Sequence, residues 1–179
     1  MIGAATLAGG VVGLVAGLAA RLAMRLLAAL NPSTEGLLVA AMFPVGSFSF
    51  QGTFVILFQA VIIGALAGAV YGLCRPALPR SPAIAGLVFG LWVAAVFTGL
   101  LVVGEDRDFQ LFGPFLVAVG LFAGIFVLFG VGVGSAAERS SSVTWQPAAT
   151  VRSWVTLVGL MGTAGAGIIL LAREVTTRT

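Results

Sequence analysis

Five apolar stretches, each about 20 residues long, constrain the fold of this chain more than any other feature. They cover roughly residues 2–20, 52–74, 84–103, 114–137 and 154–172. A bilayer core of about 30 Å requires roughly 20 apolar residues in a helix, and each stretch meets that length. Because a segment in lipid must satisfy its own backbone hydrogen bonds, we expect each stretch to form an α-helix.

The composition indicates that these stretches lie in a membrane. Hydrophobic residues make up 60% of the chain and charged residues only 8%, with a mean hydropathy of +1.16. A soluble domain usually contains about 25% charged residues, so a soluble fold could not cover this much apolar surface. We therefore expect an all-α, polytopic transmembrane helical bundle of five spans, which forms a single domain over residues 1–179 in the cell membrane.

Proline and glycine suggest where the predicted helices begin and end. The first helix is expected to continue past residue 20 to about Leu30, and the second to stop at Pro76. Pro114 opens the fourth, since proline is common at the first position of a helix. Residues 36–50 are apolar but interrupted by proline and glycine, which favours a short re-entrant or interfacial segment over a span.

The arginines indicate an orientation. Arg75 and Arg80 fall in one predicted loop, and Arg139 and Arg152 fall in another. Because cytoplasmic loops carry an excess of basic residues, both loops and the N-terminus are assigned to the cytoplasm. An alternative stays open: if residues 36–50 cross the bilayer, a six-span arrangement with the N-terminus outside places more arginines in the cytoplasm.

Small residues recur at four-residue spacing along every predicted span. Helices in lipid gain stability from close backbone approach, which glycine permits. We expect these ridges to pack helices within the chain, and a second interpretation is that the ridge on the first span forms an oligomer interface. The glycines predicted to pack helices are Gly9, Gly13, Gly17, Gly64, Gly68, Gly72, Gly86, Gly90, Gly120 and Gly124.

An internal repeat is a further hypothesis. Phe, Gly and Phe occur at matching positions in residues 48–54 and 109–115, each just before a predicted span. Parallel duplication of a two-helix unit is found in some transporters. Chance remains an alternative explanation, because such matches arise easily in a chain with 25 Gly and 13 Phe.

Arg21 and Arg25 continue the glycine ridge of the first helix and lie one turn apart, so both can face one partner. Arg21 falls about 29 Å along a helix that starts at Ile2, near the far membrane interface. Lipid phosphate is one expected partner, since long arginine side chains reach the headgroup region. The alternatives are anion permeation and ion pairing, for which the candidate acids are Glu35, Glu105, Asp106 and Asp108.

Gln59 is a neutral polar residue inside the second predicted span. We expect its amide to hydrogen-bond to a neighbouring helix, and contact with a solute is the alternative. Together with Arg21 and Arg25, it forms the set of candidate ligand or headgroup residues.

Several reactive residue types are missing from the chain. All nine basic residues are arginine, with no lysine and no histidine, which excludes a retinal Schiff base, a histidine metal ligand and an imidazole base. Cys74 is the single cysteine, so a multi-cysteine metal site is excluded as well. We expect no catalytic residues, no cofactor and no metal. Nucleic acid is not an expected partner, because no basic cluster exceeds two residues.

The sequence thus predicts a small non-enzymatic membrane protein that acts as a packing or assembly component, as a homo-oligomer or as a subunit of a membrane complex. Its expected partners are membrane lipid and, through the glycine ridges, itself or other membrane subunits. A small channel or transporter with an arginine-lined anion or solute site is the main alternative. A third class is a lipid-headgroup enzyme, in which carboxylates or the arginines would act on the headgroup.

Overall fold

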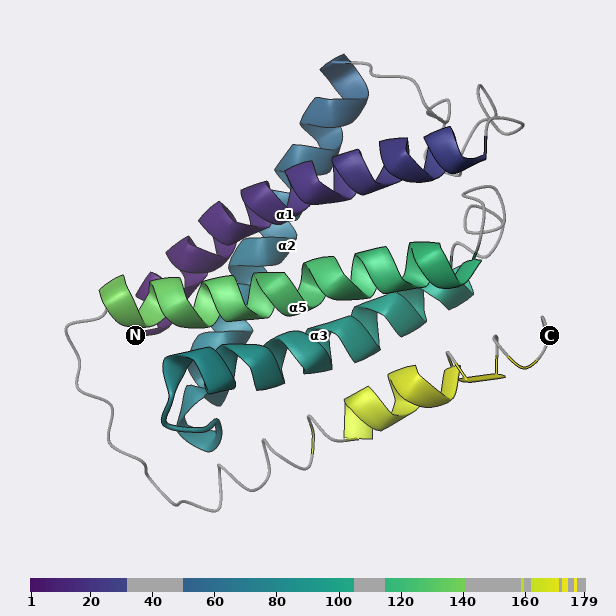
Figure 1. The fold of residues 1–179 in the computed structure, drawn as a ribbon. Helices are drawn as coiled ribbons and strands as arrows, with labels where there is room; N and C mark the ends of the chain where they lie inside the picture. The colour runs from purple at the N-terminus through teal and green to yellow at the C-terminus, as the bar shows by residue number, and fades with distance from the viewer. Residues whose placement is uncertain are drawn as a thin grey trace.

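Regular structure is entirely helical over the residues that the computed structural model describes, which are 1–31, 50–104, 115–140, 159, 162–170, 172–173 and 176. The prediction of an all-helical fold is confirmed for these residues. The elements are α1 (Ile2–Leu30), α2 (Phe50–Cys74), the 3-10 helix η2 (Arg75–Ala77), α3 (Pro82–Gly104) and α5 (Phe115–Ser140). Figure 1 shows these helices, with further helical residues beside α3 toward the C-terminus.

The helix ends follow from local backbone chemistry. Behind α1, the Asn31 N–H donates to the carbonyls of Leu27 and Ala28. The Ser81 carbonyl accepts a hydrogen bond of 2.8 Å from the Ala85 N–H, so the first turn of α3 is closed directly behind its opening proline, Pro82. The observed ends of α2, α3 and α5 differ from the predicted ones by three residues or fewer.

Three helical stretches are long and apolar enough to cross a membrane, namely Ile2–Leu30, Phe50–Ala77 and Phe115–Ser140. In α3, the stretch Pro82–Thr98 is apolar but shorter. Membrane character is therefore supported at the level of three candidate spans. The described residues of the predicted fifth span are helical, and residues 36–49 of the predicted re-entrant segment lie outside the described ranges.

Glycines bring α1 and α2 into close contact as an antiparallel pair. A Cβ atom added at Gly9 would lie 2.8 Å from the Cα of Gly68, and one added at Gly13 would lie 3.0 Å from the Cα of Gly64. Real Cβ atoms essentially never come within 3.0 Å of another heavy atom. A hydrogen side chain is therefore what allows the two backbones to approach this closely.

Close contacts between glycines also join α3 to α5. A Cβ atom added at Gly134 would lie 2.8 Å from the Cα of Gly86, and one added at Gly90 would lie 3.2 Å from the Cα of Gly130. The two pairs are connected because α1 also packs against α5, where Val12 lies directly over Gly132. The bundle is thus ordered in space as α2, α1, α5 and α3 (Figure 1).

The outer helices α2 and α3 meet at one end of the bundle. There the ring of Tyr71 contacts the ring of Phe89 edge-on, with centroids 5.3 Å apart, next to the short connection through η2. Both rings are buried in the larger apolar core. Farther from this end, α2 and α3 separate and leave a cavity between them.

The helical residues near the C-terminus dock on α3. The indole N–H of Trp92 donates to the hydroxyl of Thr163 at 2.8 Å. One turn farther along, a Cβ atom added at Gly167 would collide with the carbonyl of Ala95. A hydrogen bond and a close backbone contact therefore attach this segment to the side of α3.

Candidate functional site

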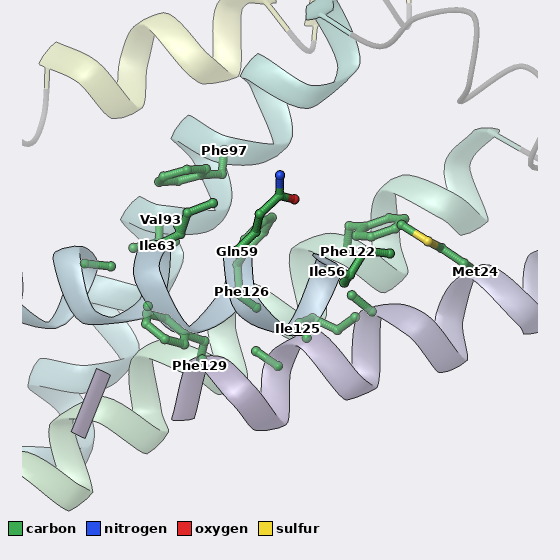
Figure 2. Close-up of a pocket in the computed structure, with 17 residues that line it drawn as sticks. Met24, Ile56, Gln59, Ile63, Val93, Phe97, Phe122, Ile125, Phe126 and Phe129 are labelled. Atoms are coloured by element: carbon green, nitrogen blue, oxygen red, sulfur yellow. The ribbon is translucent and has the colours of Figure 1, made fainter. Parts of the chain in front are cut away.

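The cavity between α2 and α3 has a volume of about 290 Å³, and all four long helices contribute to its wall. Figure 2 shows aromatic rings at its sides, with the Gln59 side chain between Phe97 and Phe122. Gln59 is the sole polar side chain among the lining residues. The lining from α1 consists of small residues and one methionine: Gly13, Ala16, Gly17, Ala20 and Met24.

Gln59 lies well inside the length of α2, and its side chain is exposed at the surface of the chain. It is about 14 Å from Phe50 along the helix, at 1.5 Å per residue. Its amide makes no hydrogen bond to another described residue, so the expected bond to a neighbouring helix of the same chain is not found within the described ranges. The amide is therefore surrounded by apolar lining residues and makes none of its possible hydrogen bonds within the described ranges.

Arg21 and Arg25 do not line the cavity, but each follows a lining residue of α1, Ala20 and Met24 respectively. Arg21 is buried between α1 and α2, where its Nε donates to the Thr53 hydroxyl at 3.4 Å. Arg25 is exposed one turn farther along α1. The four acids predicted as their ion-pair partners, Glu35, Glu105, Asp106 and Asp108, lie outside the described residues.

A second polar cluster lies at the opposite end of the bundle. Arg75, the first residue of η2, is fully buried and its Nε donates to a carboxylate oxygen of Glu138 on α5 at 2.5 Å. Its other nitrogens donate to the carbonyls of Pro79 at 2.8 Å and Arg80 at 3.0 Å, with a longer contact to Leu78. The guanidinium thus fixes the α2–α3 connection to the end of α5.

Tyr71 lies one turn before Arg75 and belongs to the same cluster. Its phenol is close enough to Arg75 and Glu138 to interact with both electrostatically. The side chain is fully buried, and its hydroxyl lies near the Glu138 carboxylate without reaching normal hydrogen-bond geometry to any described residue. The cluster therefore combines a satisfied ion pair with an unsatisfied hydroxyl.

This cluster was not predicted from the sequence, because ion pairs were considered only for Arg21 and Arg25, with acids assigned to the other side of the predicted topology. A usable signal was present, however. In the predicted topology the second and fourth spans end on the same side, and Arg75 and Glu138 stand at those two ends.

The predicted packing glycines have different surroundings. Gly9, Gly13, Gly64, Gly68, Gly86 and Gly90 lie against the backbone of a neighbouring helix. Gly17 faces the methyl group of Ala60, and Gly72 faces Ile2 and Ala5. A Cβ atom added at Gly120 or Gly124 would meet no described atom within 4 Å. On α5 it is Gly130 and Gly134 that form the contact with α3.

The described residues bring together no three His, Cys, Asp or Glu side chains in a group that could hold a metal ion. The polar features on which function can be argued are thus Gln59 at the cavity, the two arginines beside it, and the Arg75 cluster. No known protein family matches the chain, and none of the curated proteins or solved structures compared with it is significantly similar.

Proposed function

We propose that this protein is a non-enzymatic integral membrane protein that acts by assembly, with α2 as its association surface. The observation that carries the proposal is the exposed amide of Gln59, placed well inside an apolar helix. The preferred form is a homo-oligomer, and a subunit of a larger membrane complex is the second form.

The interior of a bilayer offers no hydrogen-bond partner to the amide of Gln59. Hydrocarbon chains neither donate nor accept hydrogen bonds, so a polar group that faces them remains unsatisfied. Pairing with a polar group on another helix is worth about 0.6–2 kcal/mol in membranes. A carboxamide both donates and accepts, so two copies of Gln59 related by a twofold axis can satisfy each other.

The surroundings of Gln59 on α2 favour the same function. Phe54 and Phe58 stack on each other, with centroids 6.2 Å apart, and both are exposed. Leu66, two turns beyond Phe58, is exposed as well. Apolar anchors around a single amide suit contact with another helix. A permeation path, by comparison, needs polar lining along its length, and Gln59 is the one polar side chain among the cavity residues.

We also propose the finer topology: a multi-pass protein of five spans with a cytoplasmic N-terminus, in which residues 36–50 form a re-entrant or interfacial segment. Arg75, Arg80 and Arg139 support this orientation, because they stand at the end of the bundle that carries Met1. In a Cys74→Ala background, Ser81→Cys and Ser140→Cys should react with a membrane-impermeant thiol reagent from the cytoplasmic side. Labelling from the opposite side would reverse the orientation.

The assembly proposal is tested by the mass of the protein in lipid nanodiscs. We expect the wild type to form dimers or larger oligomers and Gln59→Leu to shift toward the monomer. Gln59→Asn retains the amide and should preserve part of the association. Phe58→Leu, a neighbouring exposed apolar change, is the matched control. If wild type and Gln59→Leu have the same oligomer distribution, association through Gln59 is disproved.

A further inference from the structure

We propose that the cavity between α2 and α3 is a binding site for one anionic phospholipid, with an acyl chain inside the cavity and the phosphate at Arg21 and Arg25. This inference goes beyond the assembly function, because it concerns a lipid along the cavity and the two arginines of α1. The two proposals share one residue, Gln59, which belongs to the cavity wall.

The size of the cavity selects the kind of occupant. A helix with its side chains is about 10–12 Å across, so a piece 15 Å long would occupy on the order of 1,000 Å³. The cavity measures about 290 Å³ and cannot receive such a helix. It lies at the lower limit of small-molecule pockets, about 300 Å³, which is suitable for a single hydrocarbon chain.

The lining also fits a hydrocarbon chain. Apart from Gln59, the wall is made of aliphatic and aromatic side chains, with the small residues of α1 leaving the space between α2 and α3 open. Burial of apolar surface drives a hydrocarbon chain from water onto a wall of this kind. An acyl chain gains less on leaving the bilayer for this wall, so the cavity alone provides contact with little preference for one lipid over another.

The cavity runs lengthwise from the middle of the bundle to the level of the arginines. Along α1 its lining extends from Gly13 to Met24, about 17 Å at 1.5 Å per residue. Neither arginine lines the cavity, but Met24, the last lining residue of α1, is followed directly by Arg25 and lies three residues after Arg21. Both arginines are therefore at the height along α1 where the cavity lining ends. A lipid can therefore place its chain along α1 and its phosphate at this end.

The arginines supply the preference for an anionic headgroup. Arg21 is held by the Thr53 hydroxyl, and Ile56, one turn farther along α2, lines the cavity. A guanidinium presents several N–H donors in a planar fork and can bind phosphate in a bidentate manner while it retains another contact. Arg25 is exposed and can reach the same phosphate from the next turn of α1.

Native mass spectrometry of the full-length protein in detergent tests the proposal, with phosphatidylglycerol and phosphatidylcholine of identical chains as probes. At about 1 kcal/mol per arginine near a membrane surface, we expect the wild type to bind one phosphatidylglycerol with a preference of about thirtyfold. Arg21→Gln/Arg25→Gln should reduce this preference to near unity. Arg80→Gln/Arg139→Gln, which removes the same charge at the opposite end of the bundle, should preserve it.

A second set of variants tests the cavity itself. Ala20→Phe places a ring in the cavity and should abolish retention of both lipids, whereas Leu18→Phe, at an exposed position of α1, should not. Circular dichroism would show whether Ala20→Phe is folded. If the phenylalanine prevents folding, Ala16→Leu fills the same cavity with a smaller side chain and should likewise abolish lipid retention. Glycerol phosphate without acyl chains should not displace the bound lipid.

Three results would overturn the proposal. These are equal binding of the two lipids to the wild type, an equal loss of preference in both arginine pairs, and displacement by glycerol phosphate, which would indicate a soluble-anion site. Failure of this proposal is distinguishable from failure of the assembly function. Arg21→Gln/Arg25→Gln should remove the phosphatidylglycerol preference without altering the oligomer mass. Gln59 belongs to the cavity wall, so Gln59→Leu is judged by its oligomer mass alone.

Discussion

Arg75 and Glu138 are 63 residues apart in the chain, yet the Arg75 Nε donates directly to the Glu138 carboxylate. This contact connects the end of α2 to the end of α5, two helices that otherwise touch only slightly. The side chain of Arg75 is 1% exposed and that of Glu138 is 20% exposed. Because Arg75 also donates to carbonyls of the α2–α3 connection, one side chain positions three elements.

Removal of the charge of Arg75 or of Glu138 should therefore lower the free energy of unfolding. Glu138→Ala leaves a buried guanidinium without its counter-ion, and breaking a buried pair typically costs about 3–5 kcal/mol. We expect a loss in that range in the free energy of unfolding, measured by denaturant titration in detergent. Glu138→Gln retains an oxygen acceptor and should lose less. Arg139→Ala, at the exposed neighbouring position, is the control, and an equal loss there would contradict the role assigned to Glu138.

The pair illustrates what the sequence could and could not predict. Apolar length predicted the described helices to within a few residues, because that property is local. Pairing Arg75 with Glu138 requires the rotation of α2 and α5 about their axes, which depends on how α1 and α3 pack between and beside them. Hydropathy patterns in helices that are apolar on all sides contain little information about rotation.

Because the helices touch through glycine, adding a single methyl group at a contact glycine should lower the free energy of unfolding. In Gly64→Ala the new Cβ would collide with the Gly9 carbonyl and lie 2.8 Å from the Cα of Gly13. Backbone cannot yield as a flexible side chain can, so we expect a loss of about 1–3 kcal/mol in the free energy of unfolding. Gly124→Ala, with no described atom nearby, should be neutral or slightly stabilising. Equal effects of the two changes would rule out close packing at Gly64.

Glycine spacing predicted that helices would pack closely through glycine, but it did not predict which glycines of α5 make the contact. The i, i+4 pattern on α5 occurs at Gly120/Gly124 and again at Gly130/Gly134. At 3.6 residues per turn the two pairs point roughly 80° apart around the helix, so a single partner helix cannot contact both. The position of α3 selects Gly130 and Gly134, and that position is a tertiary property.

Removal of the buried Tyr71 hydroxyl, in contrast to the changes above, is predicted not to lower the stability of the protein. The hydroxyl lies near the Glu138 carboxylate but makes no hydrogen bond of normal geometry within the described structure, and a buried polar group without a partner costs about 1–3 kcal/mol. Tyr71→Phe removes the hydroxyl and preserves the ring contact with Phe89, so thermal stability in detergent should be unchanged or raised. Tyr71→Leu, which removes the ring as well, should be destabilising. A lower stability of Tyr71→Phe would mean that the hydroxyl does bond to Glu138.

The attachment of the C-terminal helical residues to α3 depends on Trp92 and Thr163. The Thr163 hydroxyl accepts from the Trp92 indole at 2.8 Å and itself donates to the Gly159 carbonyl at 3.0 Å. Thr163→Val preserves the shape but removes the acceptor, and interhelical hydrogen bonds in membranes are worth about 0.6–2 kcal/mol. We therefore expect easier proteolysis of the C-terminal segment and a changed Trp92 emission, measured with Trp145 and Trp154 replaced by Phe.

Thr163→Ser retains the hydroxyl and should resemble the wild type. If Thr163→Val is cleaved no faster than Thr163→Ser, the Gly167 contact with Ala95 is sufficient to hold the segment, and Gly167→Leu should then release it.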